Sequence, residues 1–326
     1  MLSERYVSTL KPGDIFRDWL IRVLGDKIRN KECDVEVYKI EPASHIVCRY
    51  EFVGENYGVI AKFYAEPTGS IKSYRPAESM EIEFNRLKKL EKIIDVPKPV
   101  AMREDFSCVL VTEYVYGKTL YSYMEAESEL YDKLAAVAQL LRRLHENTKS
   151  EYRKQDEFAH FHKILDQLRL DRENRIVYDR LLGDWWYSTL LDTPYGCMIH
   201  NDANPVNYVF SGNKVYALDF ESSWEHANPV HDLGIIAAEL KYFFAIHKND
   251  AGRAEPYINH LLLHYSQDKS ELYRIIKALP FFMALGTIRI AKLDTGKDHS
   301  TYAFRGATNY LKNIYSELIP KPWKCI

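Results

Sequence analysis

Three segments in the N-terminal third of the chain alternate hydrophobic and polar residues with a period of two. This period places neighbouring side chains on opposite faces of an extended chain, so the pattern predicts strands. Turn residues separate the segments at Pro42-Ala43-Ser44 and at Gly54-Glu55-Asn56. Together with a later apolar run, the predicted strands are residues 34–40, 46–53, 59–64 and 109–114.

Hydrophobic residues recur at helical spacing in the rest of the chain. A short amphipathic segment, residues 16–24, precedes the strands, and a helix is predicted at residues 80–94 with Leu87 and Leu90 on its apolar side. Beyond Glu127 nearly everything has a helical period. The helices predicted there are residues 130–147, 159–170, 175–190, 233–247, 255–265, 271–284 and 302–318.

A β-rich front and a helical back predict an α+β fold with two lobes. We expect a small N-terminal lobe at residues 1–116, built from an antiparallel sheet and a helix. A larger helical lobe follows at residues 117–326, and Val115-Tyr116-Gly117 is the predicted hinge.

Composition narrows the classes of function. The chain has 326 residues, 46% of them hydrophobic and 28% charged, with a net charge of −2, so it has no electrostatic footprint for nucleic acid. The apolar stretch at residues 279–291 is interrupted by Thr287 and Arg289 and is too short to span a bilayer.

The N-terminus carries charge where a signal peptide would need an apolar core. The cysteines are scattered and odd in number, as expected for reduced thiols in a cytoplasmic protein: Cys33, Cys48, Cys108, Cys197 and Cys325.

The stretch from Met198 to Gly234, MIHNDANPVNYVFSGNKVYALDFESSWEHANPVHDLG, carries the chemistry. Asn207 lies five positions after Asp202, and Asp219 lies twelve after Asn207, at the end of a short apolar strand. A carboxylate in the first loop can accept the proton of an attacking hydroxyl, while an amide oxygen and a second carboxylate hold Mg²⁺. Alone, Asp202 would read as a turn residue, and the other two residues favour the catalytic interpretation.

Two nearby polar residues are interpreted as structural. His200 is expected to brace the loop by hydrogen bonding. Asp232 precedes a predicted helix, where it would either cap the helix or hydrogen-bond back to the loop that carries Asp202.

Lys62 lies in a predicted strand with apolar neighbours on both sides. A lone strand lysine more often extends its ammonium to solvent. Glu83 follows 21 residues later on the predicted helix, however, and a strand lysine with a helix glutamate is the pair that orients ATP phosphates in kinases. Glu81 and Glu78 are alternative partners.

These residues, in this order, resemble the aminoglycoside phosphotransferase/choline kinase family, which has a protein-kinase-like fold. The matching segments are His200-Asn201-Asp202-Ala203-Asn204-Pro205-Val206-Asn207, Asp219-Phe220-Glu221, Asp232, Lys62, Glu83, residues 113–120 and residues 141–145. The resemblance implies ATP bound between two lobes, with adenine on the backbone of Glu113, Tyr114 and Val115. It also implies Asp202 as catalytic base, and Asn207 and Asp219 as magnesium ligands.

Two positions depart from the family pattern. The turn that covers the phosphates is Glu41-Pro42-Ala43-Ser44-His45, which has no glycine, so backbone amides and the Ser44 hydroxyl would have to contact phosphate. Asn201 stands where family members often have glycine.

The acceptor is predicted to be a small hydroxyl-bearing molecule. Protein kinases have lysine at the position of Asn204 and glycine at that of Glu221, and here only 13 positions separate Asp219 from Asp232, too few for a peptide platform. Glu221 and Trp224 are candidate substrate residues, and they suit an aminoalcohol, an amino-sugar or a neutral sugar. Arg289 and Lys292 would instead suit an acidic acceptor, or be solvated.

Two alternatives stay open. The glycine-free turn favours a nucleotide-binding pseudokinase with a regulatory role, and a protein Ser/Thr kinase is disfavoured by Asn204 and the short segment after Asp219. The sequence does not indicate an oligomeric state.

Overall fold

The computed structural model describes residues 3–65, 75–293 and 297–314. The chain divides into two compact units. Unit 1 consists of Met1–Lys118 and Val209–Glu221, and unit 2 of Thr119–Tyr208 and Ser222–Ile326.

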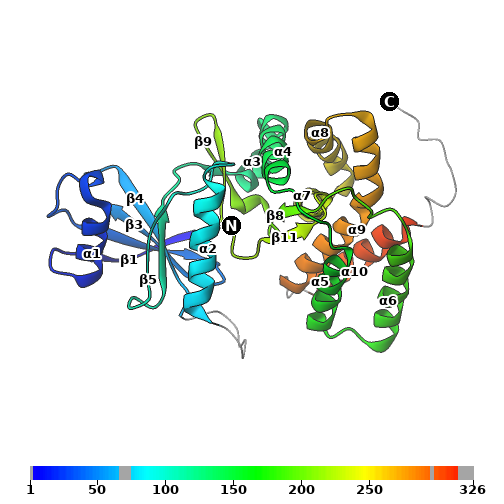
Figure 1. Cartoon of the computed structure of the whole chain (residues 1–326), viewed down its shortest axis with the longest axis horizontal. Coiled ribbons are helices and arrows are strands. Elements are labelled where there is room, and N and C mark those ends of the chain that lie inside the picture. Colours follow the sequence, from blue (N-terminus) through cyan, green and yellow to red (C-terminus); the bar gives the residue numbers. More distant parts are fainter. Residues whose placement is uncertain (1–2, 66–74, 294–296, 315–326) are drawn as a thin grey trace. The chain divides into compact units, whose positions relative to one another are not determined.

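A six-stranded sheet forms the centre of unit 1, in the order β1-β2-β3-β4-β6-β5 with every neighbouring pair antiparallel (Figure 1). The bounds are β1 Ser3–Leu10, α1 Ile15–Leu24, η1 Gly25–Lys27, β2 Val35–Glu41, β3 Ile46–Phe52, β4 Tyr57–Phe63, α2 Pro76–Leu90, β5 Pro99–Arg103 and β6 Val109–Glu113. A smaller sheet, in the order β10-β9-β7, consists of β7 Lys118–Thr119, β9 Tyr208–Ser211 and β10 Lys214–Ala217.

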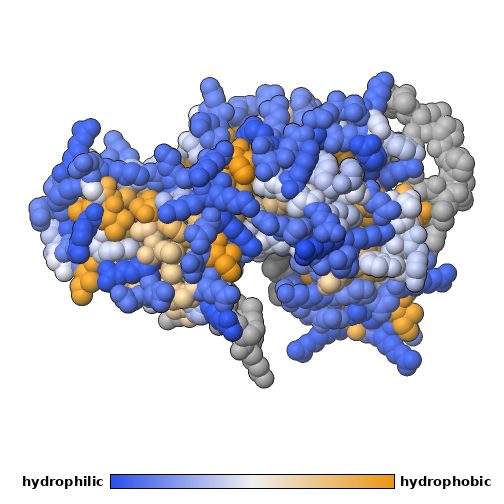
Figure 2. Space-filling view, in the orientation of Figure 1, coloured by the Kyte–Doolittle hydropathy of each residue, from blue (hydrophilic) through white to orange (hydrophobic). Residues whose placement is uncertain are grey.

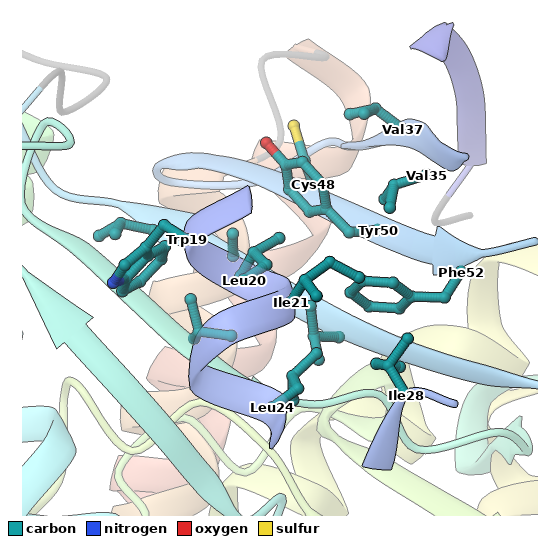
Figure 3. Close-up of a cluster of buried hydrophobic side chains, with 14 of the residues drawn as sticks. Trp19, Leu20, Ile21, Leu24, Ile28, Val35, Val37, Cys48, Tyr50 and Phe52 are labelled. Carbon is teal, nitrogen blue, oxygen red and sulfur yellow. The ribbon is translucent and has the colours of Figure 1, made fainter. Parts of the chain in front are cut away.

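Helix α1 buries its apolar side against this sheet. The Asp14 carboxylate caps the helix by accepting from the amides of Phe16 and Arg17, at 3.0 and 2.9 Å. Figure 3 shows side chains of α1, among them Leu20, packed with those of β2 and β3, among them Phe52. Both side chains are almost fully buried, so α1 and the sheet share one hydrophobic core.

The four predicted strands are present, and α2 begins and ends four residues earlier than predicted. Pro76 is favoured in the first turn of a helix, which explains the earlier start. Two strands of the large sheet were not predicted. Strand β1 is mostly exposed and therefore lacks a clear hydrophobic alternation, and β5 is only five residues long.

Unit 2 is mainly helical. The bounds are α3 Leu120–Ala126, α4 Leu130–Asn147, α5 Lys154–Leu168, α6 Arg172–Tyr187, β8 Cys197–Ile199, η2 Pro205–Asn207, β11 Trp224–Ala227, α7 Val230–Lys248, η3 Ala251–Ala254, α8 Glu255–Tyr265, α9 Lys269–Leu293 and α10 Lys297–Lys312. Helices α7 and α9 approach so closely that a Cβ on Gly234 would lie 2.2 Å from the Cβ of Phe282.

Helix α9 extends nine residues beyond its predicted end at residue 284. The added part contains the polar residues Thr287 and Arg289. The helix continues because both polar groups have partners inside unit 2: Thr287 Oγ1 donates to the carbonyl of Met283 at 2.7 Å, and Arg289 donates to Asn201 and Asp202. Residues 315–318 of the last predicted helix, and Cys325, lie outside the described residues.

Large exposed hydrophobic side chains are scattered over unit 1 and unit 2, as with Ile15 on α1, Tyr187 on α6 and Leu263 on α8. The side shown in Figure 2 is mostly hydrophilic, with small hydrophobic patches. Such isolated apolar residues are ordinary on protein surfaces. Among the described residues, no helix has both the length and the apolar character needed to cross a membrane.

Candidate active-site residues in each unit

Lys62 is the centre of an ion-pair cluster in unit 1. It lies on β4 between β3 and β6, and its side chain is almost fully buried. Its Nζ atom is 3.1 Å from Glu83 Oε2, 2.8 Å from Asp219 Oδ1 and 2.7 Å from Glu221 Oε2. Burial alone would lower the pKa of Lys62, but the carboxylates outweigh it and raise the pKa well above its usual value.

Glu83 on α2 is thus the partner of Lys62 among the three glutamates considered from the sequence. Tyr64 also donates a hydrogen bond to Glu83 Oε2. Burial and the neighbouring charges of Asp219 and Glu221 raise the pKa of Glu83, although Lys62 opposes this shift. Lysine and glutamate are therefore held in one orientation by buried contacts.

Glu221 belongs to the same cluster and connects it to the turn after β2. His45 Nε2 lies 3.0 Å from Glu221 Oε2, and the Ser44 hydroxyl donates to Glu221 Oε1 at 3.2 Å. Burial would raise the pKa of Glu221, but hydrogen bonds from His45 and Lys62 outweigh burial and bring it to about 2. The glycine-free turn is thereby tied to Glu221 within unit 1.

The carboxylates of this cluster have the chemistry of a magnesium site. Ligand oxygens of Glu83, Asp219 and Glu221 all lie within 4.8 Å of one another. Three carboxylates surround one ammonium, so negative charge is in excess, and oxygen ligands of this kind suit Mg²⁺. Asp219 has a φ of 59°, and its carboxylate is about one third exposed and therefore accessible. The other predicted ligand, Asn207, lies in unit 2.

Asp202 in unit 2 is held by both of its carboxylate oxygens. Arg289 Nη2 donates to Oδ1 at 2.7 Å, and Asn207 Nδ2 donates to Oδ2 at 3.0 Å and to the Asp202 carbonyl at 2.9 Å. Since Asn207 uses its amide nitrogen for these bonds, its amide oxygen is the atom available to a metal. The carboxylate is also about one third exposed, so it is oriented and still accessible.

Sequence reasoning missed the contact of Arg289 with Asp202. The two residues are 87 positions apart, and the one signal was a polar interruption in the apolar run 279–291. Glu239 on α7 was also missed. Burial and Asp202 raise the pKa of Glu239 to about 7, although Arg289 opposes the shift. This carboxyl therefore titrates near neutral pH.

Asp232 fixes the loop that carries Asp202. Its carboxylate accepts from the amides of His200 and Asn201, at 2.8 and 3.0 Å, and His145 Nε2 lies 3.1 Å away. Of the two roles considered from the sequence, the structure shows the hydrogen bonds back to the loop. Burial would raise the pKa of Asp232, but His145 outweighs it and the pKa is lowered. Asn201 has a φ of 61°, which explains why glycine suits its position and why asparagine is tolerated.

The change Asp232→Asn is expected to lower the free energy of unfolding by about 2–4 kcal/mol, because one of the two loop amides loses its acceptor inside the protein. Because folding lowers the pKa of Asp232, its contribution is present at neutral pH and is lost as the pH falls below about 4. Urea unfolding at several pH values measures this. The difference between wild type and variant should shrink in acid, since asparagine does not titrate.

The matched control is Asp132→Asn, because Asp132 is exposed in the first turn of α4. It should change the free energy of unfolding by less than about 0.5 kcal/mol. Equal losses for the two variants would contradict the anchoring role of Asp232.

The predicted adenine-binding segment begins at Glu113, the last residue of β6, in unit 1. The amide of Glu113 donates to the carbonyl of Lys98 at 2.9 Å and that of Tyr114 to the carbonyl of Gly58 at 3.0 Å. The Glu113 carboxylate contacts Lys27 Nζ at 2.5 Å. Two of the three predicted amides are thus used inside the sheet, whereas the amide of Val115 has no hydrogen-bond partner among the residues that the structure describes.

Trp224 lies on β11 in unit 2, whereas Glu221, the other candidate substrate residue, lies in unit 1. The Trp224 ring centroid is 5.5 Å from that of His160 on α5 and 6.0 Å from that of His231 on α7. Its indole nitrogen is buried and has no hydrogen-bond partner among the described residues. Trp224 therefore belongs to an aromatic group with an unused donor.

Comparison with known proteins agrees with the fold expected from the sequence. A choline kinase from Cryptosporidium parvum is 17% identical, with a TM-score of 0.60 over 93% of this chain and 96% of that one. An ethanolamine kinase from Plasmodium vivax is 14% identical, with a TM-score of 0.58 over 87% and 83%. The ADP-bound aminoglycoside phosphotransferase APH(2'')-Ib is 15% identical, with a TM-score of 0.52 over 96% and 94%. These neighbours are small-molecule kinases, and at such identities the likeness concerns the fold.

The predicted protein-kinase-like α+β fold is thereby confirmed. A search of curated proteins returned no match. The family model described as the phosphotransferase enzyme family, however, matches residues 49–269, more than half of the chain. This match confirms the predicted class of enzyme. The chain belongs to the phosphotransferase enzyme family.

Proposed function

We propose that the protein transfers the γ-phosphoryl group of ATP, together with Mg²⁺, to a hydroxyl of a small molecule. The observation that carries the proposal is the cluster of buried Lys62 with Glu83 and Asp219. A lysine oriented in this way by a helix glutamate positions ATP phosphates in kinases. The amide of Val115, which has no partner in the described part of the chain, supports binding of adenine. The bond of Ser44 to Glu221, which lies beside Lys62, supports a contact of Ser44 to phosphate.

Asp202 acts as the base in this proposal. The hydroxyl of the acceptor donates its proton to the Asp202 carboxylate while the hydroxyl oxygen forms the new bond to phosphorus. The bond from phosphorus to the bridging oxygen breaks, and ADP leaves with that electron pair. Arg289 and Asn207 fix the two carboxylate oxygens, so little reorganisation is needed when the hydroxyl arrives.

Asn207 and Asp219 are the residues that would hold Mg²⁺, through an amide oxygen and a carboxylate oxygen. The metal, when bound, neutralises charge on the phosphate oxygens. The excess of carboxylates around Lys62 supports this assignment. Lys62 itself supplies a positive charge to the phosphates, and Glu83 keeps its ammonium in place.

The acceptor types expected from the sequence are an amino-sugar, a sugar and an aminoalcohol, with Glu221 and Trp224 as candidate contacts. The position of Glu221 beside Lys62 and Ser44 supports a role near nucleotide phosphate instead. Trp224, with its unused indole donor, supports a role in holding an acceptor hydroxyl.

Purified protein with ATP and Mg²⁺ is expected to release ADP in the presence of at least one acceptor from a panel of sugars, amino-sugars and aminoalcohols. ADP release above the acceptor-free rate is the measurement, and Asp202→Ala is the control that should show none. If no acceptor increases ADP release, and ATP binds equally tightly with and without Mg²⁺, the result would favour the pseudokinase alternative. Phosphorylation of a protein but of no small molecule would point to a protein kinase.

A further inference from the structure

Four basic side chains lie on α5 and α9 in unit 2, and one of them, Arg289, contacts Asp202. His160 and Lys163 lie one turn apart on α5, and Arg289 and Lys292 lie one turn apart on α9. Helices α5 and α9 pack against each other (Figure 1). Arg289 contacts Asp202, so one of these four side chains touches the residue proposed as the catalytic base.

The positive charges of these side chains act on one another across the packed helices α5 and α9. Burial, together with His231 and then Arg289, Lys163 and Lys292, lowers the pKa of His160 to about 3, so its imidazole is neutral. Partial burial and the like charges of Arg289 and Lys163 also lower the pKa of Lys292. The positive charges of Arg289 and Lys163 thus make the charged form of Lys292 less favourable.

Little negative charge compensates the group. Arg289 is paired with Asp202, and Glu239 is partly protonated at neutral pH. Lys163 and Lys292 are exposed and form no ion pair within the described ranges of the chain. Two ammonium groups on the helices that carry His160 and Arg289 are therefore available to a ligand.

Buried polar nitrogens adjoin this group. The side-chain nitrogens Nε2 of His160, Nε1 of Trp224 and Nε2 of His231 have no hydrogen-bond partner in the described part of the chain. The ring centroids of His160 and His231 are 6.0 Å apart. Because the His160 imidazole is neutral, one of its two ring nitrogens is an acceptor, while the indole nitrogen of Trp224 is a donor. Such a pair of groups suits hydroxyls, which both donate and accept.

We propose that the acceptor carries an anionic group, a carboxylate or a phosphate, on the same molecule as the hydroxyl that is phosphorylated. Lys163 and Lys292 bind the anionic group, and His160 and Trp224 contact further hydroxyls. The inference rests on the proposed phosphotransferase function and narrows its acceptor to acidic sugars and other acidic alcohols. It separates this chain from its structural neighbours, whose names refer to choline, ethanolamine and aminoglycosides, all of which are cations.

A series of sugars that differ in one substituent tests the charge preference. The acceptors are glucose, glucosamine, glucuronate and glucose 6-phosphate, and glycerol, glycerate, glycerol 3-phosphate and 3-amino-1,2-propanediol form a second series. The measurement is ADP release with ATP and Mg²⁺. We expect kcat/KM for an anionic member to exceed that of its neutral and cationic counterparts by about tenfold or more. Comparing the carboxylates with the phosphates distinguishes the two anionic groups.

The double variant Lys163→Gln/Lys292→Gln tests the residues. It should raise KM for the anionic acceptor by about tenfold while leaving kcat/KM for the neutral acceptor and KM for ATP unchanged. The matched control is Lys269→Gln, because Lys269 is exposed at the other end of α9, about 35 Å along the helix from Lys292. This control should behave like wild type.

A binding measurement separates failure of this inference from failure of the proposed function. Glucuronate and inorganic phosphate should raise the melting temperature of wild type and of Lys269→Gln more than that of the double variant, whether or not turnover occurs. If the melting temperature shifts in this way but no turnover occurs, the anion site is supported and the phosphotransferase proposal is contradicted. Turnover that favours the cationic acceptors would overturn the anion site alone, as would a raised KM for ATP in the double variant. If neither turnover nor the shift in melting temperature is observed, both the anion site and the phosphotransferase proposal are contradicted.

Discussion

The change Asp202→Asn is expected to lower kcat about a thousandfold while leaving the affinity for ATP nearly unchanged. Asparagine cannot accept the proton of the acceptor hydroxyl, but it can still accept the hydrogen bond from Arg289. Asn207 also keeps its bond to the backbone carbonyl of residue 202. A base acts mainly on the transition state, so the loss falls on kcat. Steady-state ADP release and equilibrium titration with a fluorescent ATP analogue measure the two quantities.

The matched control for this prediction is Asp132→Asn, which replaces an exposed aspartate of the same unit and should keep wild-type kcat. An Asp202→Asn variant that retained kcat would rule out the base role. A variant that failed to fold would indicate that Asp202 serves the loop structure, and circular dichroism distinguishes this outcome.

The change Asp219→Ala is expected to abolish the Mg²⁺ dependence of nucleotide binding and to lower kcat/KM by about a thousandfold or more. It removes a carboxylate proposed as a metal ligand and one of the partners of Lys62. Titration of the ATP analogue with and without Mg²⁺ measures binding. Wild type should bind more tightly with the metal, and the variant should show the same weak affinity in both conditions.

Two further variants make this result specific. Asp219 has a left-handed backbone, which costs alanine about 1 kcal/mol, so Asp219→Asn tests the lost charge at a residue that tolerates this conformation. Asp26→Ala removes an exposed aspartate of the same unit and should leave the metal dependence intact. Undiminished Mg²⁺ dependence in both Asp219 variants would exclude this residue as a ligand.

The parts of the candidate site that the sequence predicted depend on local patterns. The pair Lys62 and Glu83 could be predicted because a buried strand and an amphipathic helix each have a characteristic spacing of hydrophobic residues. The loop of Asp202 could be anticipated from spacing. Neither pattern carries information on which distant helix covers the loop, so the contact of Arg289 was not predicted.

The lack of long-range information in local patterns also explains why some predicted secondary-structure elements differ from the structure. The exposed strand β1 is specified by pairing with β2 and not by its own hydrophobic pattern, so single-sequence periodicity does not detect it. Helix α9 continues past its predicted end through Arg289, whose partners Asn201 and Asp202 lie in a distant loop. Tertiary contacts decide both cases, and a one-dimensional pattern does not contain them.

The hydrogen bonds of Asp232 have a consequence for how the enzyme becomes active. Its buried carboxylate joins the loop before Asp202 to His145 on α4, and His145 in turn contacts Tyr265 on α8. An unpaired buried carboxylate is strongly unfavourable, so the loop takes its final shape only when α4, α7 and α8 have packed. We therefore expect enzyme activity to return late and cooperatively during renaturation. The recovery of activity would then report the last stage in the assembly of the helical unit.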